Sequence, residues 1–184
     1  MSGPAIASRS NFLPSKGLGN VSTTETQFLG SDGNVLAVYL PLSGKLSAPG
    51  GVKSARFVVK VHGRVTTGAS VTFTPIVYWG TSATIASNTA ISTQVTPTLA
   101  SVSTNWSTEI HLTWDATSGK LNGYYTGQSD ITRKADTTIT NVPTSVDLAA
   151  ADSTSVGFTV TGQFSATAGA TGTAFVDSFE VEVF

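Results

Sequence analysis

Apolar and polar residues alternate with a period of two between Asn105 and Gln128. Trp106, Ile110, Leu112 and Trp114 share one parity, and most positions between them are polar or charged. Successive side chains of a β-strand point to opposite faces, so this pattern predicts a strand with one apolar and one hydrated face. A Ser-Gly turn signal and a return strand follow, which predicts a hairpin. Two tryptophans on one face need a covering layer, and this favours packed sheets.

Similar alternation, separated by Gly, Pro, Asn and Asp turn signals, recurs along the chain. It predicts further strands at residues 26–29, 35–40, 55–65, 70–79, 90–95, 137–139, 146–148, 155–165 and 175–184. Pro75 interrupts one of them, so that strand should be bulged or lie at a sheet edge. We expect about eight to ten strands in one domain over residues 25–184. The fold class is all-β: an antiparallel two-sheet β-sandwich, jelly-roll-like.

The last segment is the most apolar of these strands. Phe175, Phe179, Val181 and Val183 share a parity, and we expect all four to face the core. An unpaired apolar strand is an aggregation hazard, so this strand should pair inside a sheet.

Residues 1–24 show no period and are interpreted as an extended N-terminal arm. The candidate partner-binding residues in it are Phe12, Leu13, Leu18 and Val21. Ordering the backbone costs about 1–2 kcal/mol per residue, whereas burying one large apolar side chain returns about 1.5–3 kcal/mol. Four such side chains cannot order the whole arm. It is therefore either a frayed terminus that is mobile in the free protein or an assembly arm held by a neighbouring subunit.

Composition narrows the classes of function. Charged residues are 11% of the chain and the net charge is −1, so there is no basic field for nucleic acid and no nucleic-acid partner is expected. Cysteine is absent, which excludes disulfides and zinc–thiolate sites. No apolar run approaches the ~20 residues that cross a bilayer, and the start lacks the apolar core of a signal peptide. We expect synthesis in a host cytoplasm and no membrane partner.

Candidate chemistry is sparse. His62 and His111 are the only histidines, both are expected on outer faces, and neither lies in a nucleophile or metal motif. Hence no catalytic residue, cofactor or metal ligand is assigned, although a hydrolase whose site assembles from distant strands stays an alternative. Tyr124 and Tyr125 point to opposite faces, so one should be exposed. An exposed tyrosine could stack on a sugar or pack against a cross-strand neighbour.

Four stretches of the chain resemble β-rich virion proteins of tailed bacteriophages: Trp79–Thr84, Asn105-Trp106, Leu112–Asp115 and Ser118–Gln128. The resemblance covers residues 70–184 and is nearest to head decoration (cement) proteins. These are sandwich or jelly-roll domains, often trimers, that clamp neighbouring major capsid subunits, and they have no catalytic residues to carry over.

The resemblance implies a non-enzymatic virion structural protein on the capsid surface. Its expected partners are the major capsid protein and identical subunits in a homotrimer. The alternative is a tail, collar or fibre component that binds host-surface glycan.

Overall fold

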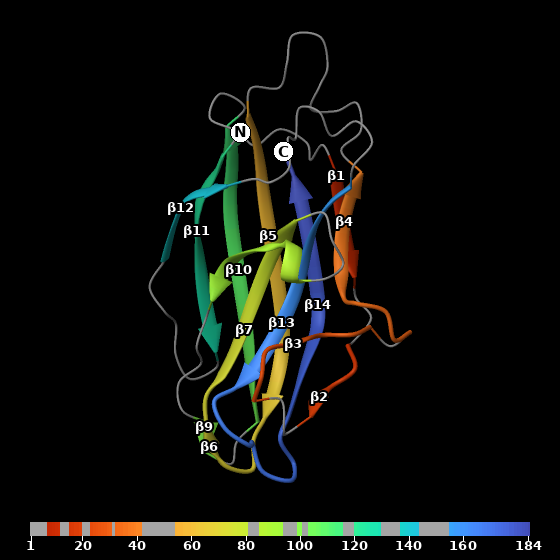
Figure 1. The fold of residues 1–184 in the computed structure, drawn as a ribbon, viewed down its shortest axis with the longest axis vertical. Helices are drawn as coiled ribbons and strands as arrows, with labels where there is room; N and C mark the ends of the chain where they lie inside the picture. The colour runs from red at the N-terminus through yellow and green to blue at the C-terminus, as the bar shows by residue number, and fades with distance from the viewer. Residues whose placement is uncertain are drawn as a thin grey trace.

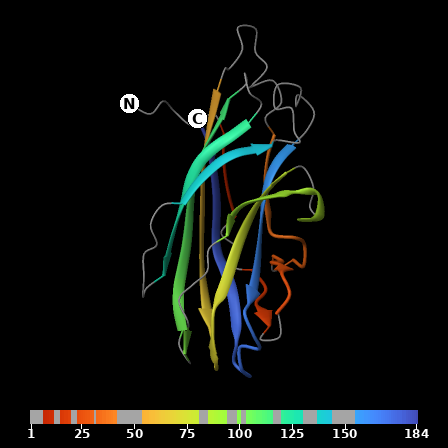
Figure 2. The same ribbon diagram turned by 60° about the vertical axis from the view of Figure 1, so that its left-hand side comes forward.

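The structure is a computed structural model that describes residues 7–11, 15–19, 23–30, 32–41, 54–80, 85–93, 99–100, 103–115, 120–129, 137–143 and 155–184. Within these residues there are fourteen strands and one 3-10 helix, η1 (Ile85–Ser87). Two antiparallel sheets face each other, as the two views of the ribbon show (Figures 1 and 2). The predicted all-β sandwich is confirmed. The predicted strand at residues 146–148 and the hairpin turn lie outside the described residues.

The first sheet has seven strands and contains the hairpin that the sequence predicts. Its order is β1 (Ala7–Asn11), β14 (Thr173–Val183), β5 (Ser54–Thr66), β10 (Ser103–Asp115), β11 (Lys120–Ser129) and β12 (Thr137–Pro143), and β2 (Leu18–Gly19) also pairs with β14. The C-terminal strand β14 thus lies between neighbours on both sides, as its apolar character requires. The long strands β5 and β10 run side by side at the centre of the sheet (Figure 1).

The second sheet has five strands. Its order is β3 (Thr26–Gln27), β13 (Ser155–Phe164), β7 (Phe73–Gly80) and β8 (Thr89–Thr93), and β4 (Ala37–Pro41) also pairs with β13. Two further short strands, β6 (Ser70–Val71) and β9 (Leu99–Ala100), pair with each other. The total exceeds the expected eight to ten because β2, β3, β6 and β9 have two residues each.

Pro75 lies in β7 opposite Gly162 of β13. The described pairing of β7 with β8 covers Ile76 to Trp79 and shifts register between Val77 and Tyr78, where Ile91 of β8 is the extra residue. The ladder is therefore bulged near Pro75, which is one of the two predicted alternatives. β7 itself lies between β13 and β8 rather than at a sheet edge.

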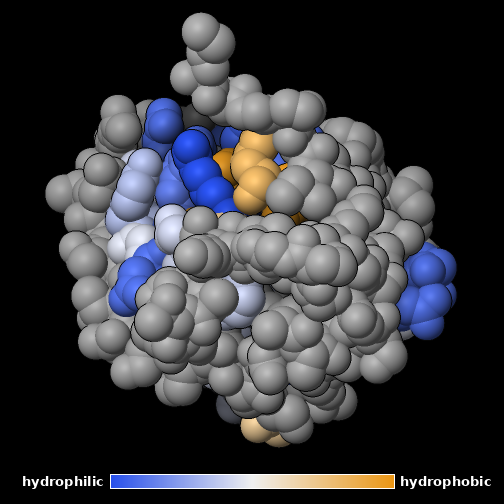
Figure 3. Space-filling model, turned by 90° about the horizontal axis from the view of Figure 1, so that it is seen from above, coloured by the Kyte–Doolittle hydropathy of each residue, from blue (hydrophilic) through white to orange (hydrophobic). Residues whose placement is uncertain are grey.

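Aromatic rings fill the space between the sheets. Phe57 of β5 packs against Trp79 of β7 with ring centroids 5.3 Å apart, and Phe73 of β7 packs against Trp106 of β10 at 5.8 Å. The apolar parity of the hairpin is buried as predicted, with Trp106 and Trp114 each 2% exposed. At one end of the molecule, seen down its long axis, described hydrophobic side chains lie beside described hydrophilic ones on the surface (Figure 3). Burial of this aromatic area between the sheets stabilises the fold.

Phe175 was expected in the core, and that prediction is wrong. The pairing of β14 with β5 shifts register between Val176 and Ser178, which leaves Asp177 as an extra residue. An extra residue reverses the parity of every side chain before it. Consequently Ala174 and Val176 are buried, while Phe175 lies half-buried on the outer face of the sheet.

The described parts of the N-terminal segment lie along the edge of β14 in their own chain. β1 pairs with residues 179–183 and β2 with residues 173–174. Between them, the Ser15 N–H donates to the Val176 carbonyl at 2.9 Å, and the Val176 N–H donates to Ser15 Oγ at 2.8 Å. These stretches therefore do not require a neighbouring subunit to hold them. Backbone hydrogen bonds to β14, in addition to apolar burial, offset the entropy cost of ordering these stretches.

Candidate functional site

The outer face of the seven-stranded sheet carries polar side chains in rows that cross the strands. Ser107 of β10 lies opposite His62 of β5 on one side and opposite Gln128 of β11 on the other. The next two rows are Lys60, Glu109 and Thr126, then Val58, His111 and Tyr124. Directly opposed side chains are close enough to interact, so each row can act as a unit. We call this surface the outer face.

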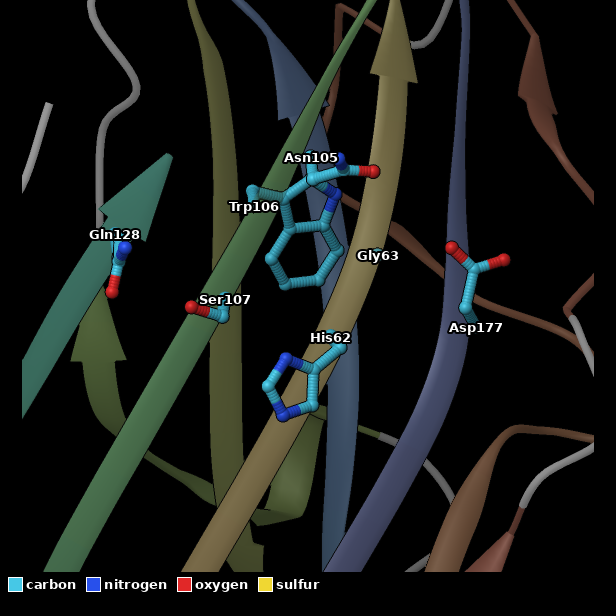
Figure 4. A pocket seen from close by; sticks show the side chains of 7 residues that line it. All are labelled: His62, Gly63, Asn105, Trp106, Ser107, Gln128 and Asp177. Atoms are coloured by element: carbon cyan, nitrogen blue, oxygen red, sulfur yellow. The ribbon is translucent and has the colours of Figure 1, made fainter. Parts of the chain in front are cut away.

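A hollow of about 370 Å³ opens on the outer face, lined by His62, Gly63, Asn105, Trp106, Ser107, Gln128 and Asp177. These residues come from four strands: β5, β10, β11 and β14. Figure 4 shows His62 and Asn105 between Gln128 on one side and Asp177 on the other. The lining therefore offers an imidazole, two amides, a hydroxyl and a carboxylate, each of which can form hydrogen bonds.

Gly63 allows the floor of the hollow to form. A Cβ at this position would lie 2.2 Å from the Phe175 carbonyl oxygen and 2.4 Å from Cζ2 of Trp106. The indole of Trp106 therefore packs directly against the Gly63 backbone. This is the close approach for which a strand uses glycine.

The bulge in β14 builds one rim of the hollow. It presents Asp177 to Arg64, whose Nε and Nη2 donate to the carboxylate at 2.8–3.1 Å. The same guanidinium lies 5.4 Å from the centre of the Phe175 ring. Hydrogen bonding to Asp177, and then its charge, raise the pKa of Arg64 above its usual value. Arg64 is thus held by a carboxylate and an aromatic ring, and the rim is pre-positioned.

A second cluster surrounds His111. Its Nε2 lies 2.7 Å from Glu109 Oε1, and its Nδ1 lies 3.4 Å from Arg56 Nη2. A guanidinium only donates hydrogen bonds, so Nδ1 accepts and the ring proton sits on Nε2, which donates to Glu109. The imidazole orientation is therefore set from both sides.

Tyr124 stacks on this oriented imidazole. The two rings are 4.9 Å apart and tilted by 21°, and Tyr124 is 42% exposed. The neighbouring Tyr125 points the other way, packs against the core and donates its hydroxyl to the Thr93 carbonyl at 2.9 Å. The prediction that the two tyrosines take opposite faces is confirmed. The cluster thus presents one exposed aromatic ring on a fixed support.

In the described part of the chain, no group of three or more His, Cys, Asp or Glu side chains could hold a metal ion. None of the described residues forms a helix long and apolar enough to cross a membrane. His62 and His111 both lie on the outer face, as predicted. His62 lines the hollow, and His111 supports Tyr124.

Of the four candidate partner-binding residues, the structure describes Leu18. It is 6% exposed and belongs to the hydrophobic core of its own chain, so its side chain already has an intramolecular partner. Phe12, Leu13 and Val21 lie outside the described residues.

No pattern in the sequence signals the hollow directly. Its residues converge only through the strand order and the bulge at Asp177, neither of which a single-strand pattern contains.

No protein-family model matches the chain, and no curated protein matches it by sequence. Among solved structures, it is similar to the lectin UEA-II complexed with galactose, with a TM-score of 0.46, 11% identity and 98% and 99% of the two chains covered. A lectin from Bauhinia forficata in complex with GalNAc gives a TM-score of 0.36 at 13% identity, covering 92% of each chain. A glycosyl hydrolase family protein from Mycobacterium fortuitum gives 0.29 at 13% identity, covering 86% and 78%. These likenesses are too distant to bear on function.

Proposed function

We propose that this protein is a non-enzymatic binding protein of a virus particle and that its outer face binds glycan. The observation that carries the proposal is the exposed Tyr124 ring, stacked on an imidazole that Glu109 and Arg56 hold in place. An aromatic ring that remains 42% exposed can stack on the apolar face of a sugar. A few placed polar groups beside it then set orientation.

Rigidity strengthens this interpretation. Tyr124 lies within β11 and has paired strands on both sides, so binding need not order a loop. A site whose side chains are already oriented loses less entropy when ligand binds, and more of the contact energy remains as affinity.

The test is binding to an array of cell-surface glycans. We expect the wild type to bind a subset of them, Tyr124→Ala to lose that binding, and Tyr124→Phe, which keeps the ring, to retain most of it. Thermal unfolding would establish that both variants fold. The proposal is wrong if no glycan binds or if a folded Tyr124→Ala binds as well as the wild type.

Capsid decoration is a second proposal, and the resemblance of residues 70–184 to cement proteins favours it. In this role the protein would sit on the capsid surface as a homotrimer and bind the major capsid protein. The net charge of −1 means that apposed copies repel each other little. A trimer by light scattering, and electron microscopy of particles with and without the protein, would test it. A monomer that fails to bind particles lacking it would exclude this role.

A further inference from the structure

The hollow and the exposed tyrosine lie on the same face, and their separation bears on ligand size. Resting on the proposed glycan-binding function, we propose that the hollow is a second sugar subsite. The ligand is then a linear, neutral oligosaccharide that lies along β10 and β11, with one ring on Tyr124 and another in the hollow.

The register of β10 and β11 defines the track between the two subsites. Tyr124 and Gln128 are four residues apart on β11 and point to the same face, with Thr126 between them. At about 3.4 Å per residue, their Cα atoms are about 14 Å apart. This distance exceeds one pyranose ring, so a ligand that contacts both ends has at least two rings. A monosaccharide can fill only one subsite.

The hollow has the chemistry of a hydroxyl-binding subsite. Sugar hydroxyls both donate and accept hydrogen bonds, and a side-chain amide such as that of Asn105 or Gln128 contains both kinds of group. The His62 imidazole adds a further polar group beside them. Asp177 faces the same hollow with its position fixed by Arg64.

The charges of the outer face favour a neutral ligand. Its described side chains include the bases Arg56, Lys60 and Arg64 and the acids Glu109, Asp177, Glu180 and Glu182. Among these described side chains, three positive charges against four negative ones give a sum of −1. Glu109 lies midway along the track, beside Thr126. An acidic sugar would meet this carboxylate, whereas a neutral one would meet only an additional hydrogen-bond acceptor.

The experiment measures affinity against ligand length. Wild type, Gln128→Ala and Tyr124→Ala are titrated with neutral linear oligosaccharides of one to six residues, built from the sugar that binds best on the array. Gln163→Ala is the matched control, because Gln163 is an amide of β13 in the other sheet, where it donates to the Thr23 carbonyl.

We expect wild-type affinity to rise with length and then level off once both subsites are filled. In Gln128→Ala the shortest ligands should bind as in the wild type, and the longer ones about threefold to tenfold more weakly, as for one lost hydrogen bond. Tyr124→Ala should weaken binding at every length, and Gln163→Ala should match the wild type.

Two results would overturn the second subsite while leaving the proposed function intact. One is a wild-type affinity that does not change with length. The other is a Gln128→Ala variant that binds long ligands as well as the wild type does, while Tyr124→Ala still loses them. Failure of Tyr124→Ala to weaken any ligand contradicts the proposed function itself. A clear preference for acidic over neutral ligands of equal length contradicts the assignment of a neutral sugar.

Discussion

Replacing Gly63 with alanine tests whether the Trp106 indole packs directly against the Gly63 backbone beneath the hollow. The added Cβ would lie 2.2 Å from the Phe175 carbonyl oxygen and 2.4 and 2.5 Å from two carbon atoms of the Trp106 indole. The Phe175 carbonyl oxygen is a backbone atom and cannot rotate away. The Trp106 indole is buried and also packs against Phe73. To remove the clash, either β14 must shift at its bulge or the indole must move.

Overpacking by one carbon in a tight core typically costs about 1–3 kcal/mol. In a chain of this length, each kcal/mol lowers the melting temperature by about 2–4 °C. We therefore expect Gly63→Ala to melt about 2–12 °C below the wild type. Gly19→Ala is the matched control, because its Cβ would meet nothing within 4 Å. We expect that control to change stability by no more than about 0.5 kcal/mol.

Thermal unfolding followed by tryptophan fluorescence gives the melting temperatures of both variants, and urea unfolding gives their free energies of unfolding, since all three tryptophans are buried. If Gly63→Ala were as stable as Gly19→Ala, the close approach of Trp106 to the Gly63 backbone would be wrong. The described floor of the hollow would then be wrong as well.

Two further predictions concern the core and the second sheet. Phe57→Ala removes a ring packed against Trp79 and Phe158 and should cost about 3–5 kcal/mol in urea unfolding; a loss below about 1 kcal/mol would contradict the aromatic core. Burial, followed by a hydrogen bond to Glu25, raises the pKa of Tyr78 from 10.0 to about 12. The resulting stabilisation should be complete below pH 10 and lost as the pH rises towards 12, and Tyr78→Phe should abolish this slope in alkaline unfolding titrations.

The sequence predicts most of the fold because, along each strand, the apolar side chains that alternate with polar ones are the ones that are buried. Trp106 and Trp114, and the apolar positions of β5, take the faces that alternation assigns to them. The error at Phe175 has one cause, the extra residue Asp177. No local pattern marks this insertion, because Asp177 and Ser178 are both polar and either could occupy a hydrated position. A bulge depends on the partner strand, which single-strand periodicity does not contain.

The candidate site was predicted in part. Alternation placed His62, His111 and one tyrosine on outer faces, and the structure confirms this. The stacking of Tyr124 on His111 follows from the register of β10 with β11, which places the two residues opposite each other. The hollow could not be predicted, because it also requires β14 next to β5, two strands more than 100 residues apart in the sequence.

The central claim is that the outer face of the seven-stranded sheet is the working surface of this protein. Nuclear magnetic resonance titration with the tightest-binding glycan from the array tests it most directly. We predict shifts that follow β10 and β11 from His111 and Tyr124 towards Gln128, with little change in β7 or β13. Shifts centred on the five-stranded sheet, or spread evenly over the molecule, would contradict it.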